Sequence, residues 1–202
     1  MPKTIKQFEE IKNKRINQIL NISLKLFCDV GYDAISVDDI CKKAKISHGL
    51  FYHYFTSKRN VYNEIFQRGE PQISFIENDL LSPSLKGLLF LEKLNSTILF
   101  ILRKNDISCY YLYFIIESAF MHRDKHQILK KLDEKIFKKV LQAIKEAQDL
   151  REICPGNPKE LLFTYVSLLL GLTVIKMKNK ENYAIPSDDI VMNLFYRKGL
   201  IK

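Results

Sequence analysis

Apolar residues recur at steps of three and four positions along nearly the whole chain, which is the period of an amphipathic helix rather than of a strand. The few Gly and Pro residues fall between these runs, where they punctuate successive helices. The first run predicts a helix that ends near Gly31, with inward positions at Ile16, Ile19, Leu20, Ser23, Leu24 and Phe27. The pattern therefore indicates an all-helical protein.

Two short helices are predicted next, separated by only a few residues. Ser36 is a suitable N-cap for a helix over 37–44, whose first turn is acidic. Ser47 can cap a second helix that runs to about Tyr54. This is the spacing of a helix-turn-helix. A further helix opens at Ser57, and its inner face carries Val61, Tyr62, Ile65 and Phe66.

The rest of the chain predicts five more helices, at about 84–103, 107–121, 125–150, 158–178 and 187–199. Residues 110–116 are apolar enough to mimic a buried strand, but their neighbours are helical, so helix is preferred. The longest apolar stretch, 161–175, is shorter than the ~18–20 residues of a membrane span. It is interpreted as a buried helix, and no membrane partner is expected. The expected fold is all-α, with about nine helices.

Charge narrows the choice of partners. The chain of 202 residues is 47% hydrophobic, enough for a buried core, and its formal net charge is +9. Residues 1–68 hold 12 Lys and Arg against 7 Asp and Glu, so the positive excess is concentrated near the N-terminus. This balance favours nucleic acid or an anionic membrane surface.

The cysteines indicate neither a zinc site nor a disulfide framework, because Cys28, Cys41, Cys109 and Cys154 are far apart and form no CxxC pair. The first residues lack the apolar stretch of a signal peptide. Both features predict a cytoplasmic protein. No metal ligand, cofactor or catalytic residue is predicted, since the chain has no phosphate-binding glycine loop and no His and acidic pair at metal-ligand spacing.

The second short helix has two different faces on a helical wheel. Phe51, Phe55 and Leu50 point to one side, where they are expected to pack. The other side carries His48, Gly49, Tyr52 and His53. His48 could donate to a purine N7 or O6 in the major groove, and Gly49 would let the helix approach a base closely. The hydroxyls of Tyr52 and Tyr54 can bond phosphate oxygens. The alternative is that these aromatic residues are simply core.

Two charged residues flank this helix. Lys58 lies in the first turn of the next helix, where a cation opposes the helix dipole, so a phosphate bound there would relieve the repulsion. An ordinary solvated lysine is the alternative. Asp38 could accept from a cytosine N4, although a first-turn acid that favours the helix dipole is the simpler interpretation.

The N-terminal third resembles the signature of the TetR family of transcriptional regulators over about residues 15–60. The matching residues include Gly31-Tyr32, Ser36-Val37-Asp38-Asp39-Ile40, Ile46-Ser47, Gly49, Phe51-Tyr52-His53-Tyr54-Phe55 and Ser57-Lys58. The resemblance implies that phosphates are held by Ser36, Ser47, Tyr52, Tyr54 and Lys58. It also implies that His48, Gly49, Tyr52 and His53 lie nearest the base edges.

The chain departs from the family pattern at several positions. Lys45 replaces the usual turn glycine, so a left-handed backbone there is expected to cost ~1 kcal/mol. Leu50 replaces a common threonine and removes a hydroxyl that often meets phosphate. Ser23 and Cys41 stand where alanines are usual. These changes bear on individual contacts and on the operator sequence.

The resemblance also implies two domains. A helix-turn-helix domain of three helices, 1–58, is followed by a larger helical domain, 59–202, that binds a small effector and forms a homodimer through helices near 158–178 and 187–199. Gly171 in the first of these favours a close helix contact. Candidate effector residues are Phe100, Tyr110, Tyr113, Phe114, Glu117 and Tyr165. Glu117 could instead be exposed or paired, because acids are seldom buried.

The expected function is a repressor that binds double-stranded, palindromic operator DNA as a homodimer and is released by an effector. A ligand-responsive activator is an alternative. An enzyme would need Cys109 or Cys154 as nucleophile and His122 or His126 as base, and their spacing gives no support. A membrane-surface or scaffolding protein is the third possibility, motivated by the positive charge and the lysine-rich region 125–145.

Overall fold

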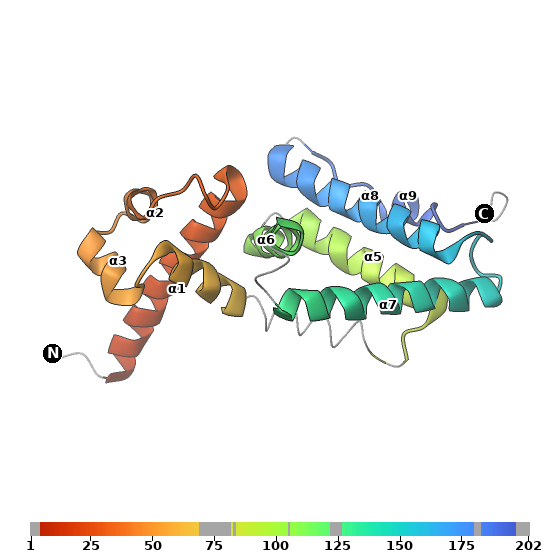
Figure 1. Cartoon of the computed structure of the whole chain (residues 1–202), viewed down its shortest axis with the longest axis horizontal. Helices are drawn as coiled ribbons and strands as arrows, with labels where there is room; N and C mark the ends of the chain where they lie inside the picture. The colour runs from red at the N-terminus through yellow and green to blue at the C-terminus, as the bar shows by residue number, and fades with distance from the viewer. Residues whose placement is uncertain are drawn as a thin grey trace. The chain divides into compact units, whose positions relative to one another are not determined.

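The structure is a computed structural model, which describes residues 5–68, 82, 84–104, 106–121, 127–179 and 183–196. Within these ranges the regular elements are all helices, as the apolar pattern predicts (Figure 1). The chain divides into two compact units, residues 1–72 and 73–202.

The first unit contains α1 (Ile5–Val30), α2 (Val37–Ala44), α3 (His48–Tyr54) and a helical segment over 58–68. The predicted inward positions of α1 from residue 19 onward are buried, and Ile16 is half-buried. The core is completed by residues from all four helices and the Phe55 turn, namely Leu20, Leu24, Phe27, Ile40, Phe51, Phe55, Val61 and Ile65. α2 packs against α1 and α3 packs against α2, so each short helix buries one face in this small core.

The helical segment 58–68 belongs to the first unit, whereas the sequence placed the domain boundary after residue 58. The Tyr62 ring lies 6.1 Å from the Phe27 ring and 4.9 Å from the Tyr32 ring, between ring centres. Arg68 donates to the side chain of Asn17 in α1. The apolar face of this segment therefore completes the core of the helix-turn-helix.

The turn between α2 and α3 passes through a left-handed residue, as expected from the sequence. Lys45 has φ 54° and ψ 49°. Its N–H donates to the carbonyl of Lys42 at 3.2 Å, and the next N–H, of Ile46, donates to that of Cys41 at 3.0 Å. These bonds satisfy carbonyls at the end of α2, and they hold a non-glycine residue in a conformation that glycine adopts without strain.

Replacing Lys45 by glycine is expected to raise the free energy of unfolding by about 0.5–1 kcal/mol. Relief of the left-handed strain, about 1–2 kcal/mol, exceeds the greater chain entropy that glycine has when unfolded. Chemical denaturation of the full chain measures the change. Lys45→Ala is the control, because it removes the same side chain and keeps the strain. Equal stability of the two variants would contradict this explanation.

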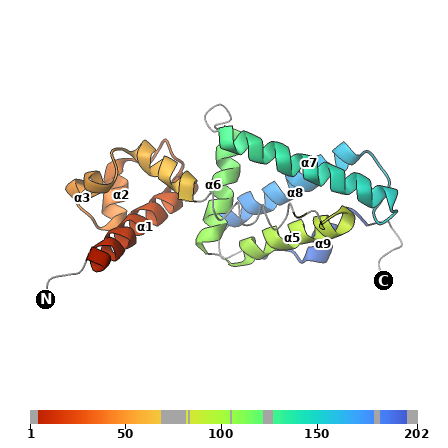
Figure 2. The ribbon, with the colours of Figure 1, turned by 90° about the horizontal axis from the view of Figure 1, so that it is seen from below.

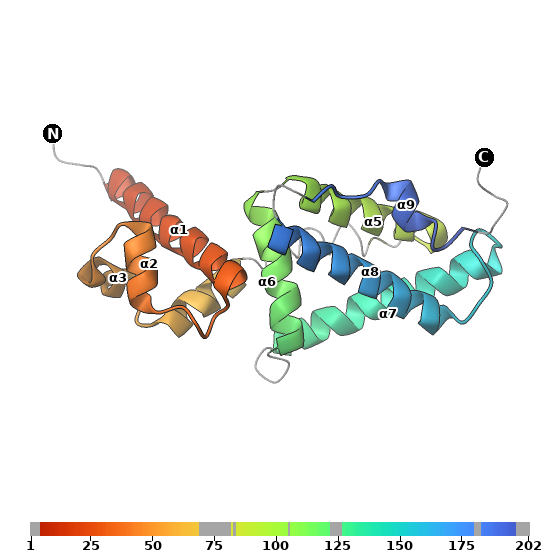
Figure 3. The same cartoon turned by 90° about the horizontal axis from the view of Figure 1, so that it is seen from above.

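The second unit contains α5 (Gly87–Lys104), α6 (Ile107–Met121), α7 (Gln127–Asp149), α8 (Pro158–Asn179) and α9 (Asp188–Met192). α5, α7 and α8 pack side by side, and α6 crosses them at one end (Figures 2 and 3). The predicted boundaries of α5 to α8 are confirmed to within about three residues. Residues 110–116 are helical, as preferred from their neighbours.

α9 is shorter than the predicted helix over 187–199. It ends at Met192, and residues 193–195 form a turn in which the Phe195 N–H donates to the Met192 carbonyl at 2.8 Å. The Phe195 carbonyl then accepts from the Cys154 N–H at 2.7 Å, and its ring packs against Tyr165. The turn thus lets the chain bury Phe195 against α8; residues 197–202 lie outside the described part of the chain.

α9 is held on α5 by polar contacts at its first residue. Asp188 accepts from the Asn95 amide at 3.2 Å and from the Arg103 guanidinium at 2.9 Å. Arg103 also donates to the Pro186 carbonyl at 2.7 Å. Partial burial acts to raise the pKa of Asp188, but the hydrogen bonds from Arg103 and Ser96 outweigh it and the pKa is lowered.

α8 is not fully buried in the single chain, contrary to the expectation for 161–175. Its inner face includes Leu162, Tyr165, Leu169 and Leu172, whereas Phe163, Leu168, Val174 and Ile175 are exposed. By length and composition α8 is also apolar enough to cross a membrane, and 39% of its most apolar window is buried. One face of this helix is therefore available to a partner.

Candidate nucleic-acid interface

Both short helices of the first unit begin with the serine cap that the sequence predicts. The Asp39 N–H donates to Ser36 Oγ at 3.1 Å, and the Ser36 N–H donates to Asp39 Oδ2 at 2.9 Å, which makes a capping box. The Leu50 N–H donates to Ser47 Oγ at 3.1 Å. The hydrogen bonds from Ser36 lower the pKa of Asp39, so its carboxylate is ionised near neutral pH.

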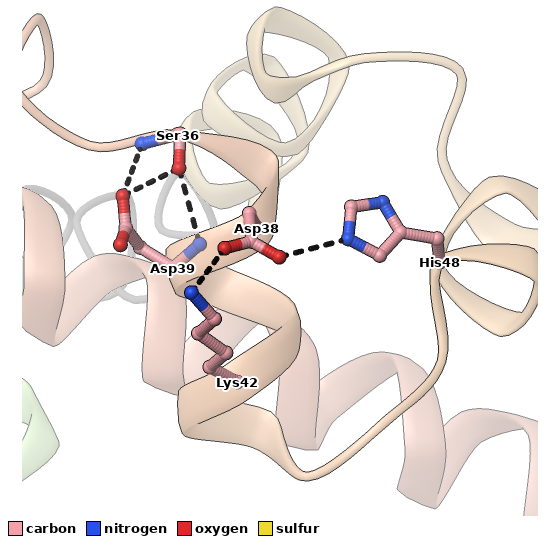
Figure 4. A network of polar contacts seen from close by, with 5 residues as sticks. All are labelled: Ser36, Asp38, Asp39, Lys42 and His48. Atoms are coloured by element: carbon pink, nitrogen blue, oxygen red, sulfur yellow. Dashed lines mark hydrogen bonds and ion pairs between the residues drawn. The ribbon is translucent and has the colours of Figure 1, made fainter.

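The hydroxyls of Ser36 and Ser47 differ in whether their proton remains available to donate to a phosphate. Ser36 Oγ lies 2.5 Å from Asp39 Oδ2, so its hydroxyl proton is directed at that carboxylate (Figure 4). Ser36 thus caps α2, and the phosphate contact that the family resemblance implies for it stays a prediction. Ser47 is exposed, and its hydroxyl accepts the Leu50 N–H. Accepting that bond leaves its proton to donate.

α3 divides into the two faces that its helical wheel predicts. Phe51 and Phe55 are 0% and 3% exposed, so their interpretation as core is confirmed. Tyr52 is 55% exposed, and His48, Gly49 and His53 are also exposed. Tyr54 is half-buried, with its ring 4.8 Å from that of His53. The outer face of α3 therefore presents aromatic and imidazole side chains that are not buried in the core of the unit.

Gly49 lies in the middle of this exposed face. A Cβ atom built on it would meet only the Ser47 hydroxyl, at 3.9 Å, so the unit itself has room for a side chain there. Packing within the chain therefore does not explain why a glycine stands at this position.

Gly49→Ala is expected to keep or raise stability, by up to about 1 kcal/mol from helix propensity, and to weaken DNA binding at least tenfold. The binding loss follows if the backbone of α3 approaches a base closely, because a methyl group then collides with it. Thermal unfolding and DNA titration of the same preparation separate the two effects. Unchanged DNA affinity would show that α3 does not approach DNA closely at this residue.

Lys58, for which a phosphate contact is predicted, hydrogen-bonds to backbone carbonyls of the first unit, and the phosphate contact stays a prediction. Its ammonium donates to the carbonyls of Ile35 at 2.6 Å and Tyr32 at 2.8 Å, and faces that of Asp33 at 3.5 Å. It also lies 4.3 Å from the centre of the Tyr32 ring. All three donors of the ammonium are directed inward. Lys58 thus holds the loop between α1 and α2, which positions the start of α2.

Asp38 links the two helices of the helix-turn-helix. Its carboxylate lies 2.5 Å from the Lys42 ammonium, one turn along α2, and 3.0 Å from Nε2 of His48 at the start of α3 (Figure 4). Hydrogen bonds from Lys42 and His48 lower the pKa of Asp38. The i,i+4 spacing of Asp38 and Lys42 is visible in the sequence, but the contact with His48 depends on the angle between two helices and was not predicted.

The candidate effector residues of the second unit differ in burial. Phe100 is 57% exposed on α5, with the Lys104 ammonium 4.9 Å from its ring centre, and its role in an effector site stays a prediction. Tyr113 and Phe114 are buried in α6, while Tyr110 and Glu117 are half-buried. Tyr165 is fully buried in α8. The concentration of aromatic residues in this part of the sequence therefore did not show which of them are buried and which are exposed.

Tyr165 carries a buried hydroxyl that has no hydrogen-bond partner among the described residues. Burial, with a smaller contribution from the charge of Asp188, raises its pKa, so it stays a donor. The side-chain oxygen of Asn95 is likewise buried and unpartnered in this part of the chain. Sequence reasoning missed Asn95, which lies among apolar residues of α5.

The four cysteines form no disulfide with one another. Cys28, Cys41 and Cys109 are buried, and Cys154 is half-buried. Burial raises the pKa of the Cys109 thiol, which makes it a poor nucleophile at neutral pH. His122 and His126, the bases considered for an enzyme, lie outside the described residues.

Comparison with known proteins agrees with this geometry. Residues 19–65 match the model of the bacterial regulatory proteins of the tetR family. The uncharacterised HTH-type transcriptional regulator YhgD of Bacillus subtilis is 24% identical over 185 residues, which are 90% of this chain and 94% of YhgD. The IcaR negative transcriptional regulator of the biofilm operon icaADBC of Staphylococcus aureus is 33% identical over 48 residues, only 24% of this chain and 26% of IcaR.

Solved structures show the same fold along most of the chain. The MbdR regulator of Azoarcus sp. CIB superposes with a TM-score of 0.72 at 16% identity, over 89% of this chain and 96% of MbdR. SmeT in its complex with triclosan gives a TM-score of 0.56 at 17% identity, over 92% and 93% of the two chains. Since the matched residues 19–65 contain the helix-turn-helix described above, the first unit carries the helix-turn-helix of the TetR family of bacterial regulatory proteins, and the chain as a whole has the fold of TetR-like regulators.

Proposed function

We propose that this regulator is a homodimeric repressor that binds a palindromic operator and is released by a small-molecule effector. The observation that carries the DNA-binding part is the outer face of α3, where His48, Gly49, Tyr52 and His53 are exposed opposite a buried Phe51. Ser47 and Tyr54 flank this face and supply hydroxyls for phosphate contacts. The repressor role is supported by the similarity to IcaR, which is named as a negative regulator. A cytoplasmic location would follow from this function.

The homodimer is supported by an apolar strip that we call the α8 stripe, composed of Phe163, Leu168, Val174 and Ile175 with Gly171 among them. The four apolar residues are between 38% and 60% exposed, although they lie on a helix rather than in a loop. A Cβ atom on Gly171 would meet nothing within 4 Å, so another helix can approach its backbone. A second copy of α8 would cover the stripe in a two-fold dimer, matching an operator with two half-sites. α9 ends at Met192, so it would offer this interface a shorter helix than the one predicted over 187–199.

Release by an effector is supported by the unpartnered polar atoms of Tyr165 and Asn95 inside the second unit. A buried hydroxyl without a partner costs about 1–3 kcal/mol, which a ligand group that accepts its hydrogen would recover. The structure of SmeT, which shares the fold, is a complex with the small molecule triclosan. An effector acts only through its different affinity for the DNA-bound and free states.

Tyr165→Phe is expected to raise the free energy of unfolding of the ligand-free protein by about 1 kcal/mol, because it removes an unpartnered buried hydroxyl. The matched control is Tyr196→Phe. The Tyr196 hydroxyl donates to Glu92 at 3.2 Å, so the same deletion there should lower stability. Denaturant titration of both variants makes the comparison. If Tyr165→Phe is destabilised as much as the control, the Tyr165 hydroxyl has a partner in solution and gives no support to an effector site.

DNA retardation and vesicle sedimentation test the proposal against the membrane-surface alternative. The full chain should retard duplex DNA from its own promoter region, with an affinity that falls steeply between about 50 and 200 mM salt. It should not sediment with anionic lipid vesicles. Sedimentation with vesicles and no retardation of the promoter DNA would favour the membrane alternative, for which the exposed α8 stripe would be the contact.

A further inference from the structure

His48 is held by a residue of the neighbouring helix before any DNA is bound. Its Nε2 lies 3.0 Å from Asp38 Oδ1, and the second oxygen of the same carboxylate lies 2.5 Å from the Lys42 ammonium. The His48 side chain is 54% exposed and that of Asp38 48%. Figure 4 shows the other ring nitrogen, Nδ1, directed away from Asp38. The imidazole is therefore oriented by α2 while one of its edges stays accessible.

The charge of Asp38 decides which nitrogen of His48 carries the hydrogen. Hydrogen bonds from Lys42 and His48 lower the pKa of Asp38, so it is a carboxylate at neutral pH. A carboxylate only accepts, and hence Nε2 must be the protonated nitrogen. In a neutral imidazole the other nitrogen then carries a lone pair and accepts hydrogen bonds. The neighbouring charged group is Lys42, and the Tyr52 ring lies 6.5 Å from the His48 ring on the same helix.

We infer that Asp38 is a positioning residue for DNA specificity: it fixes His48 with Nδ1 as an acceptor, so that His48 selects a base with a major-groove amino group. Adenine N6 and cytosine N4 offer such a group, whereas guanine presents the acceptors N7 and O6. This reverses the donor role that the sequence suggests for His48. The inference rests on the proposed contact of α3 with base edges.

The tautomer can be measured without DNA. Two-bond correlations between ring protons and the imidazole nitrogens of ¹⁵N-labelled full-length protein distinguish the two neutral forms, and the chain has 4 histidines. The His48 signals are identified by their loss in His48→Gln. At about pH 8, where histidines are generally neutral, we expect the form with hydrogen on Nε2. In Asp38→Asn the amide can donate or accept, so both forms should appear. A wild-type His48 with hydrogen on Nδ1 would overturn the inference.

Selection of bound fragments from random duplex DNA then tests the effect on sequence. His48→Ala identifies the position in each half-site where His48 acts. There the wild type should enrich adenine or cytosine over guanine about five- to tenfold, the worth of one such hydrogen bond. Asp38→Asn should lose most of this preference. Asp39→Asn is the matched control. It removes the same negative charge one residue along, but the Asp39 carboxylate bonds Ser36 and not His48.

The outcomes separate this inference from the proposed function. An enriched palindrome with guanine at the His48 position, or one that Asp38→Asn leaves unaltered, overturns the inference and leaves operator binding intact. A wild type that enriches no sequence overturns operator binding, and the inference with it.

Discussion

Lys58→Met is expected to lower the free energy of unfolding by about 2–3 kcal/mol. The substitution removes two short hydrogen bonds from a charged donor, to the carbonyls of Ile35 and Tyr32, and hydrogen bonds to charged groups are each worth about 1.5–3 kcal/mol. The expected loss is smaller than the combined value of about 3–6 kcal/mol, because Lys58 is only half-buried and water can replace part of the two bonds. Denaturant unfolding of the full chain, followed by helical circular dichroism, measures the difference.

The control for Lys58→Met is Lys43→Met, which removes an exposed lysine of α2 in the same unit. It should alter stability by no more than about 0.5 kcal/mol. Salt dependence of DNA binding distinguishes the two roles considered for Lys58. A phosphate contact would flatten the slope by about one unit per half-site when removed, whereas a residue that only holds the loop leaves it unchanged. A stable variant with a flatter slope would restore the phosphate role.

The double substitution Val174→Glu with Ile175→Glu is expected to raise the dissociation constant of the dimer at least a hundredfold. Four carboxylates would have to enter the interface of two α8 stripes, and a hundredfold change corresponds to only about 2.7 kcal/mol. Folding of the single chain should survive, since both residues are 41% exposed within it. Operator affinity should fall with the dimer, because one reading helix then binds without its copy.

Analytical ultracentrifugation over a range of concentrations measures this dissociation. Leu89→Glu is the control, an equally drastic change at a 58% exposed leucine of α5 that lies outside the α8 stripe. It should leave the dimer intact. A double variant that still dimerises as tightly as the wild type would place the interface on another face.

Local features of this protein could be predicted from its sequence, because short-range chemistry determines them. The caps at Ser36 and Ser47 follow from residue type and spacing, and the division of α3 into a packed Phe51 side and an exposed Tyr52 side follows from helical geometry. The left-handed backbone at Lys45 was expected by comparison with a family glycine. Each of these depends on residues within one or two helical turns.

The remaining features depend on how helices meet, which no local pattern encodes. Lys58 reaches carbonyls 23 and 26 residues earlier in the chain, and Asp38 meets His48 across the turn between α2 and α3. In α8 the apolar residues lie on both faces, so the sequence did not show that Tyr165 points inward and Phe163 outward. The end of α9 is set by the burial of Phe195 against Tyr165, a tertiary contact.

Selection of bound fragments from random duplex DNA by the wild-type protein tests the central claim most directly. A two-fold dimer that reads DNA with α3 should enrich one palindrome, whose half-sites are separated by one or more helical turns, about 10 base pairs each. Recovery of an enriched sequence without two-fold symmetry would contradict the dimer. Recovery of no enriched sequence would contradict operator recognition.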